Sequence, residues 1–522
     1  MLKEIFRKNR KFMLLSVATS LIASLATLAI PFLSNRLFAQ VADIQLINVL
    51  LVVGVMLGSY FFQVLLILLR ENAAVNVNEK NLRQFLDKLF HVEYDTMIAT
   101  GNNNLIDKVA ALTNSIYQFM LNDVIQLVSA VVIITGSLFW LYRENLFYGL
   151  AVNCLIPTTF FGYKLLNKEL GRRSKKLQAV TSKNFQDIMS IYEQPDFVKQ
   201  QVHFSGIEHL MAQRIQEIYQ AHAEINRFAG TSSQIINFLN TFVENAILLL
   251  ISYQVAIGKT QVGSLVVFTL VISIFFDAVY SLNHLNLNYT RLKVNTAFYQ
   301  EEISGNLETT TGTPVTTIEK LAFKAPTVTV GDTKFSYPLT AQFTPGDVVY
   351  LAGKSGAGKS TLVRALLNVR PVTGITINEL PLNQLDKGTL RGRIAYVPQS
   401  ASLIPGTLRE NILVDTQQSP EVDAKIQQLN ILQPLWQNKS LDTLILRNGE
   451  NLSGGEKQRV AIARALLQEA DVYIFDEVTS NLDGTSQEIF FSEFIASLEK
   501  KIVFIISHDE GVAQYANRRL TF

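Results

Sequence analysis

Six stretches rich in apolar residues follow one another along the first part of the chain. They lie at residues 12–32, 47–69, 124–141, 146–166, 234–257 and 262–282. Each is close to the length of about 20 residues that an α-helix needs to cross about 30 Å of hydrocarbon. A helix satisfies its backbone polar groups internally, as the bilayer requires. The pattern therefore predicts an all-α domain of six transmembrane helices over residues 1–310.

The first stretch follows a basic front, as the core of a secretory signal peptide would. Its length, from residue 12 to residue 32, exceeds that of a usual signal core, and five further stretches follow it. We therefore expect a first membrane helix that the protein retains.

Two long polar segments connect the second stretch to the third and the fourth to the fifth. They keep a helical spacing of apolar residues, as in ENAAVNVNEKNLRQFLDKLF, without Gly- or Pro-rich breaks. This periodicity predicts that the membrane helices continue far into the cytoplasm. The interruptions at residues 92–101 and 190–200 are the expected inner turns.

Basic residues gather on one side of the predicted membrane. That side holds the chain start and the segment between the fourth and fifth stretches, whereas the short loops opposite offer only Arg36, Arg143 and Lys259. Cytoplasmic loops carry the excess of Lys and Arg. We therefore expect a multi-pass protein of the cell membrane with both chain ends in the cytoplasm.

Composition agrees with a protein that contacts the lipid bilayer. Hydrophobic residues make up 48% of the chain and charged residues only 17%, against about 25% charged in soluble proteins, and the mean hydropathy is +0.21. Charges are sparse before Tyr299 and ordinary after Val315, which separates a second domain, residues 311–522. The net charge of +2 gives no reason to expect nucleic acid. The single cysteine, Cys154, excludes a disulfide framework and a Cys-rich metal site.

The fifth stretch carries a row of polar side chains on one helical face. The row consists of Asn237, Asn240, Thr241, Glu244 and Asn245, and Asp277 adds a carboxylate in the sixth stretch. An ionisable group within a bilayer is costly and normally faces the bundle interior or a wet path. We therefore expect Glu244 to line a substrate cavity. Hydrogen bonding between helices, or a position outside the hydrocarbon for some of the row, is the alternative.

The most specific motif follows a short apolar run at residues 348–352. Gly353, Gly358, Lys359 and Ser360 complete G-x-x-x-x-G-K-S, and a helical pattern comes next. In this context glycines let backbone N–H groups wrap phosphates. Lys359 would neutralise phosphate oxygens and Ser360 would ligate Mg²⁺. The predicted site for ATP and Mg²⁺ includes the whole loop: Gly353, Lys354, Ser355, Gly356, Ala357, Gly358, Lys359, Ser360 and Thr361.

A second apolar run, residues 472–475, ends in Asp476 and Glu477. A buried parallel strand would place these carboxylates at its carboxyl edge, where α/β sheets bind ligands. Asp476 suits the Mg²⁺ shell, and Glu477 suits a base that positions the attacking water. Residues 311–522 are therefore expected to form an α/β P-loop ATPase domain.

Residues 451–467, NLSGGEKQRVAIARALL, resemble the signature motif of the ATP-binding cassette (ABC) family. Gln399 in AYVPQ, Asp483 in SNLD and His508 in IVFIISHD match further elements of that family in order. TGNNNLIDKVAALTNSI, after the second stretch, resembles the first inner loop of its exporters. The resemblance covers essentially the whole chain. It implies an exporter half-transporter, which fuses one membrane domain to one nucleotide-binding domain and works with a second chain, identical or homologous.

The resemblance also implies roles for single residues. Ser453, Gly454 and Gly455 would begin a helix that faces the γ-phosphate of the partner chain's ATP. Asp483 would belong to the same nucleotide site. Tyr337 in KFSYP would stack on adenine, and plain packing on one strand face is the alternative.

Three further residues are implied as the catalytic set. Gln399 would sense Mg²⁺ and the γ-phosphate, His508 would contact the γ-phosphate, and Glu477 would act on the attacking water.

The chain departs from the family pattern at three places. Glu456 stands where glutamine is commonest, and Arg447 stands where exporters usually carry a glutamate. Phe522 ends the sequence soon after His508, so we expect a nucleotide-binding domain without appended regulatory helices. We also expect no peptidase domain before the first stretch.

The motifs leave the direction of transport and the substrate open. An importer of the same architecture, for example for metal chelates, is one alternative. A membrane sensor that binds ATP without transporting anything is another, and the intact Lys359, Glu477 and His508 argue against it.

Overall fold

The computed structural model describes residue 7 and residues 10–39, 46–259, 261–309, 311–354, 356–414, 417–480 and 482–522. The chain divides into two compact units. One comprises Met1–Val92 and Thr96–Leu307, and the other comprises Glu93–Asp95 and Glu308–Phe522. We describe each unit by itself and call them the helical unit and the ATPase unit.

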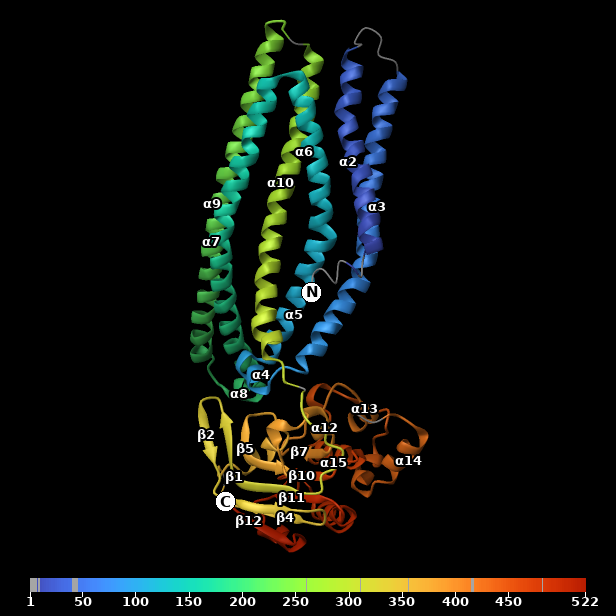
Figure 1. Ribbon diagram of the computed structural model, residues 1–522, viewed down its shortest axis with the longest axis vertical. Coiled ribbons are helices and arrows are strands. Elements are labelled where there is room, and N and C mark those ends of the chain that lie inside the picture. Colours follow the sequence, from blue (N-terminus) through green and yellow to red (C-terminus); the bar gives the residue numbers. More distant parts are fainter. Residues whose placement is uncertain are drawn as a thin grey trace. The chain divides into compact units, whose positions relative to one another are not determined.

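Long helices build the helical unit, as Figure 1 shows. They are α2 (Arg10–Ala39), α3 (Leu46–Leu89), α5 (Asn102–Tyr117), α6 (Val124–Glu144), α7 (Leu146–Tyr192), α9 (Ser205–Ala256) and α10 (Val262–Phe298). Each of the six apolar stretches coincides with part of one helix. By length and composition, five helices in the described residues could cross a membrane. The fourth stretch lies in α7, where the side chains of several residues are outside the described set.

The polar segments continue these helices, as the periodicity predicts. Helix α9 has 52 residues, or about 78 Å at 1.5 Å per residue, more than twice the hydrocarbon thickness. The expected inner turns contain short helices, α4 (Tyr94–Thr100) and α8 (Pro195–Gln200). A π-helical turn, η2 (Gln118–Asp123), joins α5 to α6.

The helices of this unit pack against one another in pairs. Helix α2 lies against α3 and α6, and α7 runs along α9. On α5 the residues Leu105, Val109, Leu112 and Ile116 are buried. Their spacing of three and four residues forms one stripe, which is why this polar segment is helical.

A parallel sheet forms the centre of the ATPase unit, with strands in the order β12-β4-β11-β10-β7. These strands are β4 (Val348–Ala352), β7 (Ile394–Val397), β10 (Val472–Asp476), β11 (Ile502–Ile506) and β12 (Arg518–Thr521). In β10, Val472 and Ile474 pack into one apolar cluster, whereas Tyr473 and Phe475 pack into another. The sheet is therefore covered on both faces, which explains the continuous apolar runs.

A second, antiparallel sheet has the order β2-β1-β5-β6, with β3 also paired to β1. Its strands are β1 (Leu321–Val330), β2 (Thr333–Ser336), β3 (Thr340–Phe343), β5 (Val372–Ile377) and β6 (Leu380–Pro381). The strands β8 (Gly406–Thr407) and β9 (Leu444–Ile445) form a separate pair. The helices of the unit are α11 (Lys359–Ala365), α12 (Lys387–Gly392), α13 (Leu408–Ile412), α14 (Pro420–Gln428), α15 (Gly454–Leu467) and α16 (Gly484–Ile489). The fold class is thus the predicted one, a helical region followed by an α/β domain.

Candidate ATP site

Neighbouring parallel strands bring the predicted site residues to one sheet edge. The phosphate loop follows β4, and His508 comes two residues after β11. Glu477 directly follows β10, and Gln399 comes two residues after β7. Because these four strands are adjacent and parallel, their carboxyl ends meet at the same edge, where such sheets bind ligands.

The phosphate loop has the curvature that its glycines permit. Gly356 and Gly358 have φ angles of 80° and 83°, a left-handed conformation that favours glycine. A Cβ atom on Gly358 would lie 2.6 Å from the hydroxyl of Tyr337, so a larger residue does not fit there. Ser355 lies outside the described residues.

Lys359 is held inside this loop. Its side chain is buried, and its Nζ donates to the carbonyl oxygens of Gly353 at 2.6 Å and Lys354 at 3.1 Å. The ammonium group is therefore enclosed by the loop that is predicted to wrap phosphates.

Asp476 and Ser360 meet across the sheet edge. Ser360 Oγ donates to Asp476 Oδ1 at 2.9 Å, and the Tyr396 hydroxyl donates to Asp476 Oδ2 at 3.0 Å. Asp476 is only 2% exposed. A hydroxyl and a carboxylate are hard oxygen ligands of the kind that Mg²⁺ takes together with substrate phosphates. The described residues hold no group of three or more His, Cys, Asp or Glu that could bind a metal. A bound nucleotide would supply further oxygen ligands to Mg²⁺ at this pair.

Tyr396 is a site residue that the sequence analysis missed. Arg364 Nε donates to its hydroxyl oxygen at 3.0 Å, so the tyrosine links this arginine to Asp476. Burial is the main cause that raises the pKa of Tyr396 to about 12. The phenol therefore keeps its proton at neutral pH and donates it to the carboxylate. The sequence signal that could have indicated Tyr396 was its position three residues before Gln399.

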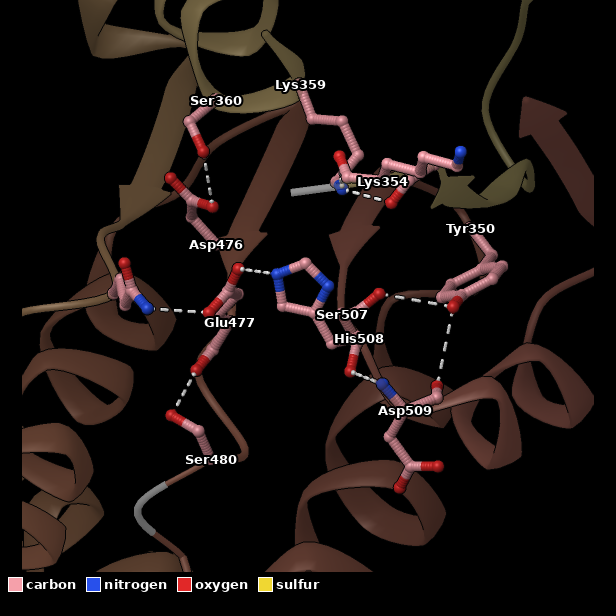
Figure 2. Close-up of polar contacts among 12 residues, drawn as sticks. Tyr350, Lys354, Lys359, Ser360, Asp476, Glu477, Ser480, Ser507, His508 and Asp509 are labelled. Carbon is pink, nitrogen blue, oxygen red and sulfur yellow. Dashed lines mark hydrogen bonds and ion pairs between the residues drawn. The ribbon is translucent and has the colours of Figure 1, made fainter. Parts of the chain in front are cut away.

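The predicted catalytic residues converge on one carboxylate, as Figure 2 shows. His508 Nε2 lies 2.8 Å from Glu477 Oε1, and Gln399 Nε2 donates to Glu477 Oε2 at 2.6 Å. The backbone of Glu477 has a φ of 53°, which is uncommon for a residue with a side chain. Such backbone strain persists where surrounding contacts fix it and is frequent at functional sites.

The two aromatic residues near the loop differ in exposure. Tyr337 is 6% exposed and donates to the Gly358 carbonyl at 3.1 Å, whereas Phe335 is 45% exposed. Both line a cavity of about 480 Å³ together with Ala357 and Thr361. Adenine stacking by Tyr337 stays a prediction, and Phe335 offers the more exposed ring of the same cavity.

The signature helix α15 begins with a reciprocal cap. Ser453 Oγ accepts from the Glu456 N–H at 3.2 Å, and Glu456 Oε2 accepts from the Ser453 N–H at 2.7 Å. Lys439 Nζ also donates to Glu456 Oε1 at 2.6 Å. Glu456 therefore completes the cap and forms an ion pair with Lys439. The glutamate that stands in place of glutamine thus has a partner for its charge.

Asp483 lies at the start of another helix. Its Oδ1 accepts from the Ser486 N–H at 2.8 Å and caps α16, and its carboxylate pairs with Arg459 of the signature helix. The bond from the Ser486 backbone is the main cause that lowers the pKa of Asp483. Asp483 thus joins the segment after β10 to α15, and a direct role in nucleotide binding stays a prediction. Arg447, the second departure, is exposed in a 3₁₀ turn, η7 (Arg447–Gly449).

Comparison with known proteins identifies the chain. The family model for ABC transporters matches residues 337–480. An ATP-dependent lipid A-core flippase of Thiobacillus denitrificans is 26% identical over 83% of this chain and 76% of its own length. By this match residues 337–480 belong to the ABC transporter family.

Two further likenesses agree with this membership. The structure of a bacterial Atm1-family ABC exporter with ATP bound has a TM-score of 0.86, covers 98% of this chain and 94% of its own, and is 19% identical. It shows the fold: helical domain and ATPase domain are fused as in exporters. A mesentericin-Y105 transport/processing protein of Leuconostoc mesenteroides is 36% identical over 34% of this chain and 25% of its own length. These names describe flipping, export and transport with processing, so the importer alternative is not favoured. Together with the ABC transporter match, they indicate an ATP hydrolase coupled to transport.

The helical unit contains a cavity of about 470 Å³ between α2, α3, α6 and α10, lined by polar and apolar side chains. Asp277 lines it, as does Arg70, which follows directly on the second apolar stretch. The hydroxyls of Ser24 and Ser129 meet there at 2.6 Å. Glu244 is half-buried on α9 and is not part of this lining, so its place in a substrate cavity stays a prediction.

Proposed function

We propose that this chain is one half of a dimeric exporter that hydrolyses ATP with Mg²⁺ at composite sites. The observation that supports it most is the carboxylate of Glu477, which lies between His508 Nε2 at 2.8 Å and Gln399 Nε2 at 2.6 Å. Both neighbours hold the carboxylate at the sheet edge beside Ser360 and Asp476. A base in that position can orient water toward the terminal phosphate.

The residues of the chain divide the work of hydrolysis. Lys359 and the loop N–H groups would bind the β- and γ-phosphates, and His508 would neutralise charge that develops on the γ-phosphate. Ser360 and Asp476 would hold Mg²⁺, which would offset the negative charge of the phosphates. Tyr396 would orient Asp476 through its hydrogen bond. Glu477 would hold the attacking water by accepting its proton in a hydrogen bond.

The second half of each site would come from the partner chain. The start of α15, with Ser453, Gly454 and Gly455, presents backbone N–H groups of a 14-residue helix. Such a helix start attracts a phosphate group. This phosphate would belong to the nucleotide that the partner chain binds. We propose a second copy of this chain as the simplest partner, since Glu477 and the signature motif are both intact.

ATP binding would close the two ATPase units together, and hydrolysis would release them. The ATPase units would lie in the cytoplasm. The chain start and the segment between the fourth and fifth stretches are rich in basic residues, and such segments lie on the cytoplasmic side. The substrate would enter the bundle from the same side and leave on the other.

The test is ATP hydrolysis by the full chain, purified alone and reconstituted in lipid nanodiscs. The expected result is turnover that needs Mg²⁺ and a native mass of two copies. Sealed vesicles with outward-facing ATPase units should then accumulate substrate inside in an ATP-dependent manner. Activity that appears only after a different half-transporter is added would replace the identical partner by a homologous one. Loss of substrate from such vesicles would contradict export.

A further inference from the structure

A second polar cavity of the helical unit lies among α5, α7, α9 and α10 and encloses about 300 Å³. Each of the four helices contributes polar or basic side chains. Those used below are Lys108 on α5, Gln178 and Thr181 on α7, His222 on α9 and Arg291 on α10.

The two basic side chains of this cavity, Lys108 and Arg291, have no close ion-pair partner among the described residues. Neither Lys108 nor Arg291 forms an ion pair or hydrogen bond with another described residue, and no described carboxylate lines the cavity. The Lys108 ammonium lies 5.6 Å from the centre of the Phe298 ring. Asp107, next to Lys108 in the sequence, acts on it electrostatically without forming an ion pair, and both Asp107 and Arg291 are exposed.

Two other basic residues of the same helices are paired. Lys176 Nζ lies 3.1 Å from Glu224, and Arg214 Nε lies 2.9 Å from Asp187.

Neutral donors complete the lining. The hydroxyl of Thr181 is buried and has no hydrogen-bond partner among the described residues. Gln178 adds an amide, and His222 has a ring N–H in either protonation state. By contrast, the Asn295 amide is already used, because it donates to Ser115 Oγ at 2.6 Å. A buried hydroxyl without a partner costs free energy unless a ligand or water satisfies it.

We propose that this cavity binds a small soluble molecule through its phosphate or carboxylate group, with Lys108 and Arg291 as the charged ligands. An oxyanion is the chemistry that two cations and a free hydroxyl recognise together. A cavity of this size accommodates a small metabolite and not a nucleotide stacked in full.

The position of the cavity favours a soluble source over a lipid headgroup. Arg291 comes nine residues after the last apolar stretch, which ends at residue 282, or about 13 Å along the helix. His222 precedes the fifth stretch by twelve residues, or about 18 Å. The headgroup layer reaches only about 5–8 Å beyond the hydrocarbon, so the cavity lies past it.

The experiment is calorimetric titration of the full chain in phosphatidylcholine nanodiscs with inorganic phosphate and, separately, with citrate. ADP is kept at saturation so that the phosphate loop is occupied. Saturable binding of at least one anion is expected. The double variant K108Q/R291Q should bind it at least tenfold more weakly.

Two variants serve as controls. Lys293 is exposed on the same helix two residues from Arg291 and does not line the cavity, so K293Q removes one charge and should bind within about twofold of the unmodified chain. R291K keeps the charge and should retain binding within about threefold. The ADP-dependent shift in unfolding temperature verifies that each variant is folded.

The absence of saturable binding to the unmodified chain would overturn the proposal. So would equal affinity of K108Q/R291Q and K293Q, which would place the binding elsewhere. Repeating the titration with 30% phosphatidylglycerol in the nanodisc, roughly a bacterial content of anionic lipid, separates the sources. Loss of phosphate binding in that membrane would show that a headgroup occupies the cavity and would contradict a soluble ligand.

Discussion

The ATP site and the cavity between α2, α3, α6 and α10 hold their polar side chains in different ways. In the ATP site, side chains from different strands fix one another, as Gln399 and His508 fix Glu477. In the cavity the hydroxyls of Ser24 and Thr27 have two partners each. Ser24 donates to the Ser20 carbonyl of its own helix at 2.7 Å and also meets Ser129 of a neighbouring helix at 2.6 Å.

This difference has a consequence for recognition. A hydroxyl can rotate between its own helix and another acceptor, so the cavity can rearrange its donors without moving its backbone. The carboxylates of the ATP site stand on a sheet buried on both faces and cannot adapt in this way. The side chains of the ATP site are therefore fixed in one arrangement, whereas the hydroxyls of the cavity can take more than one.

The largest effect is expected from Glu477→Gln. Steady-state ATP turnover should fall by about 10²–10³-fold, because the group that positions water is lost, while ATP affinity should persist. Phosphate release and nucleotide binding are measured side by side. Glu499→Gln, an exposed glutamate of the same unit, is the matched control. Turnover within twofold of the unmodified chain would remove Glu477 from the mechanism.

Lys359→Ala should weaken nucleotide binding itself by about tenfold or more. The loop then loses the cation that neutralises phosphate oxygens. A fluorescent nucleotide titration measures the affinity, and Lys425→Ala, an exposed lysine of α14, controls for the lost charge. Unchanged affinity in Lys359→Ala would mean that the loop does not hold phosphates.

Tyr396→Phe tests a residue that lies in the AYVPQ motif but was not among the predicted site residues. It removes the hydrogen bond of 3.0 Å to Asp476, and bonds to charged groups contribute about 1.5–3 kcal/mol. ATP turnover at limiting Mg²⁺ should fall about five- to tenfold, with a smaller loss at saturating Mg²⁺. Tyr515→Phe is the control, since that ring is 40% exposed. An equal loss at all Mg²⁺ concentrations would argue against orientation of Asp476.

The candidate catalytic residues come together as the motifs suggest because β4, β11, β10 and β7 are adjacent, so motifs far apart in sequence end at one edge. Tyr396 could not be predicted, because a tyrosine in a strand is usually core, and its partner Asp476 is known only from the fold. The ion pair between Lys439 and Glu456 was also not predicted, because the contact between these two residues is known only from the fold.

In the helical unit the helical spacing of apolar residues predicted each long helix. It did not predict which residues line the cavities. A hydroxyl such as that of Ser24 satisfies itself on the preceding turn and leaves no trace in the hydrophobic pattern. The cavity of Lys108 and Arg291 depends on four helices that come together only in the folded unit. Glu244 was predicted to line a cavity because it is charged. The residues that line the cavity between α2, α3, α6 and α10 are mostly uncharged.

A smaller effect is expected from Lys439→Met, which leaves the Glu456 carboxylate unpaired at the helix start predicted to face a phosphate. ATP turnover should fall about two- to threefold by repulsion, and the double variant Lys439→Met/Glu456→Gln should recover it. A double variant no better than Lys439→Met would show that the lysine acts in another way.

The same pair predicts a dependence of stability on pH. Burial raises the pKa of Glu456, but the bonds from Lys439 and Ser453 outweigh it and hold the pKa below its ordinary value of 4.5. A lowered pKa stabilises the folded state above that value, and the stabilisation is lost as the pH falls through the folded pKa. The difference in unfolding temperature between the unmodified chain and Lys439→Met should therefore narrow below pH 4.5.

The smallest effect on ATP hydrolysis should come from Asp277→Asn and Glu244→Gln, which both lie in the helical unit. Their comparison decides which carboxylate belongs to the substrate path. Asp277 lines the described cavity and can attract a cationic group, so its loss should raise several-fold the concentration at which cationic dyes stimulate hydrolysis. Glu244→Gln should shift that concentration less, because its side chain is outside this lining. A larger shift for Glu244→Gln would restore the placement expected from the polar face of α9. It would also mean that the substrate path runs along that helix rather than through the cavity beside α10.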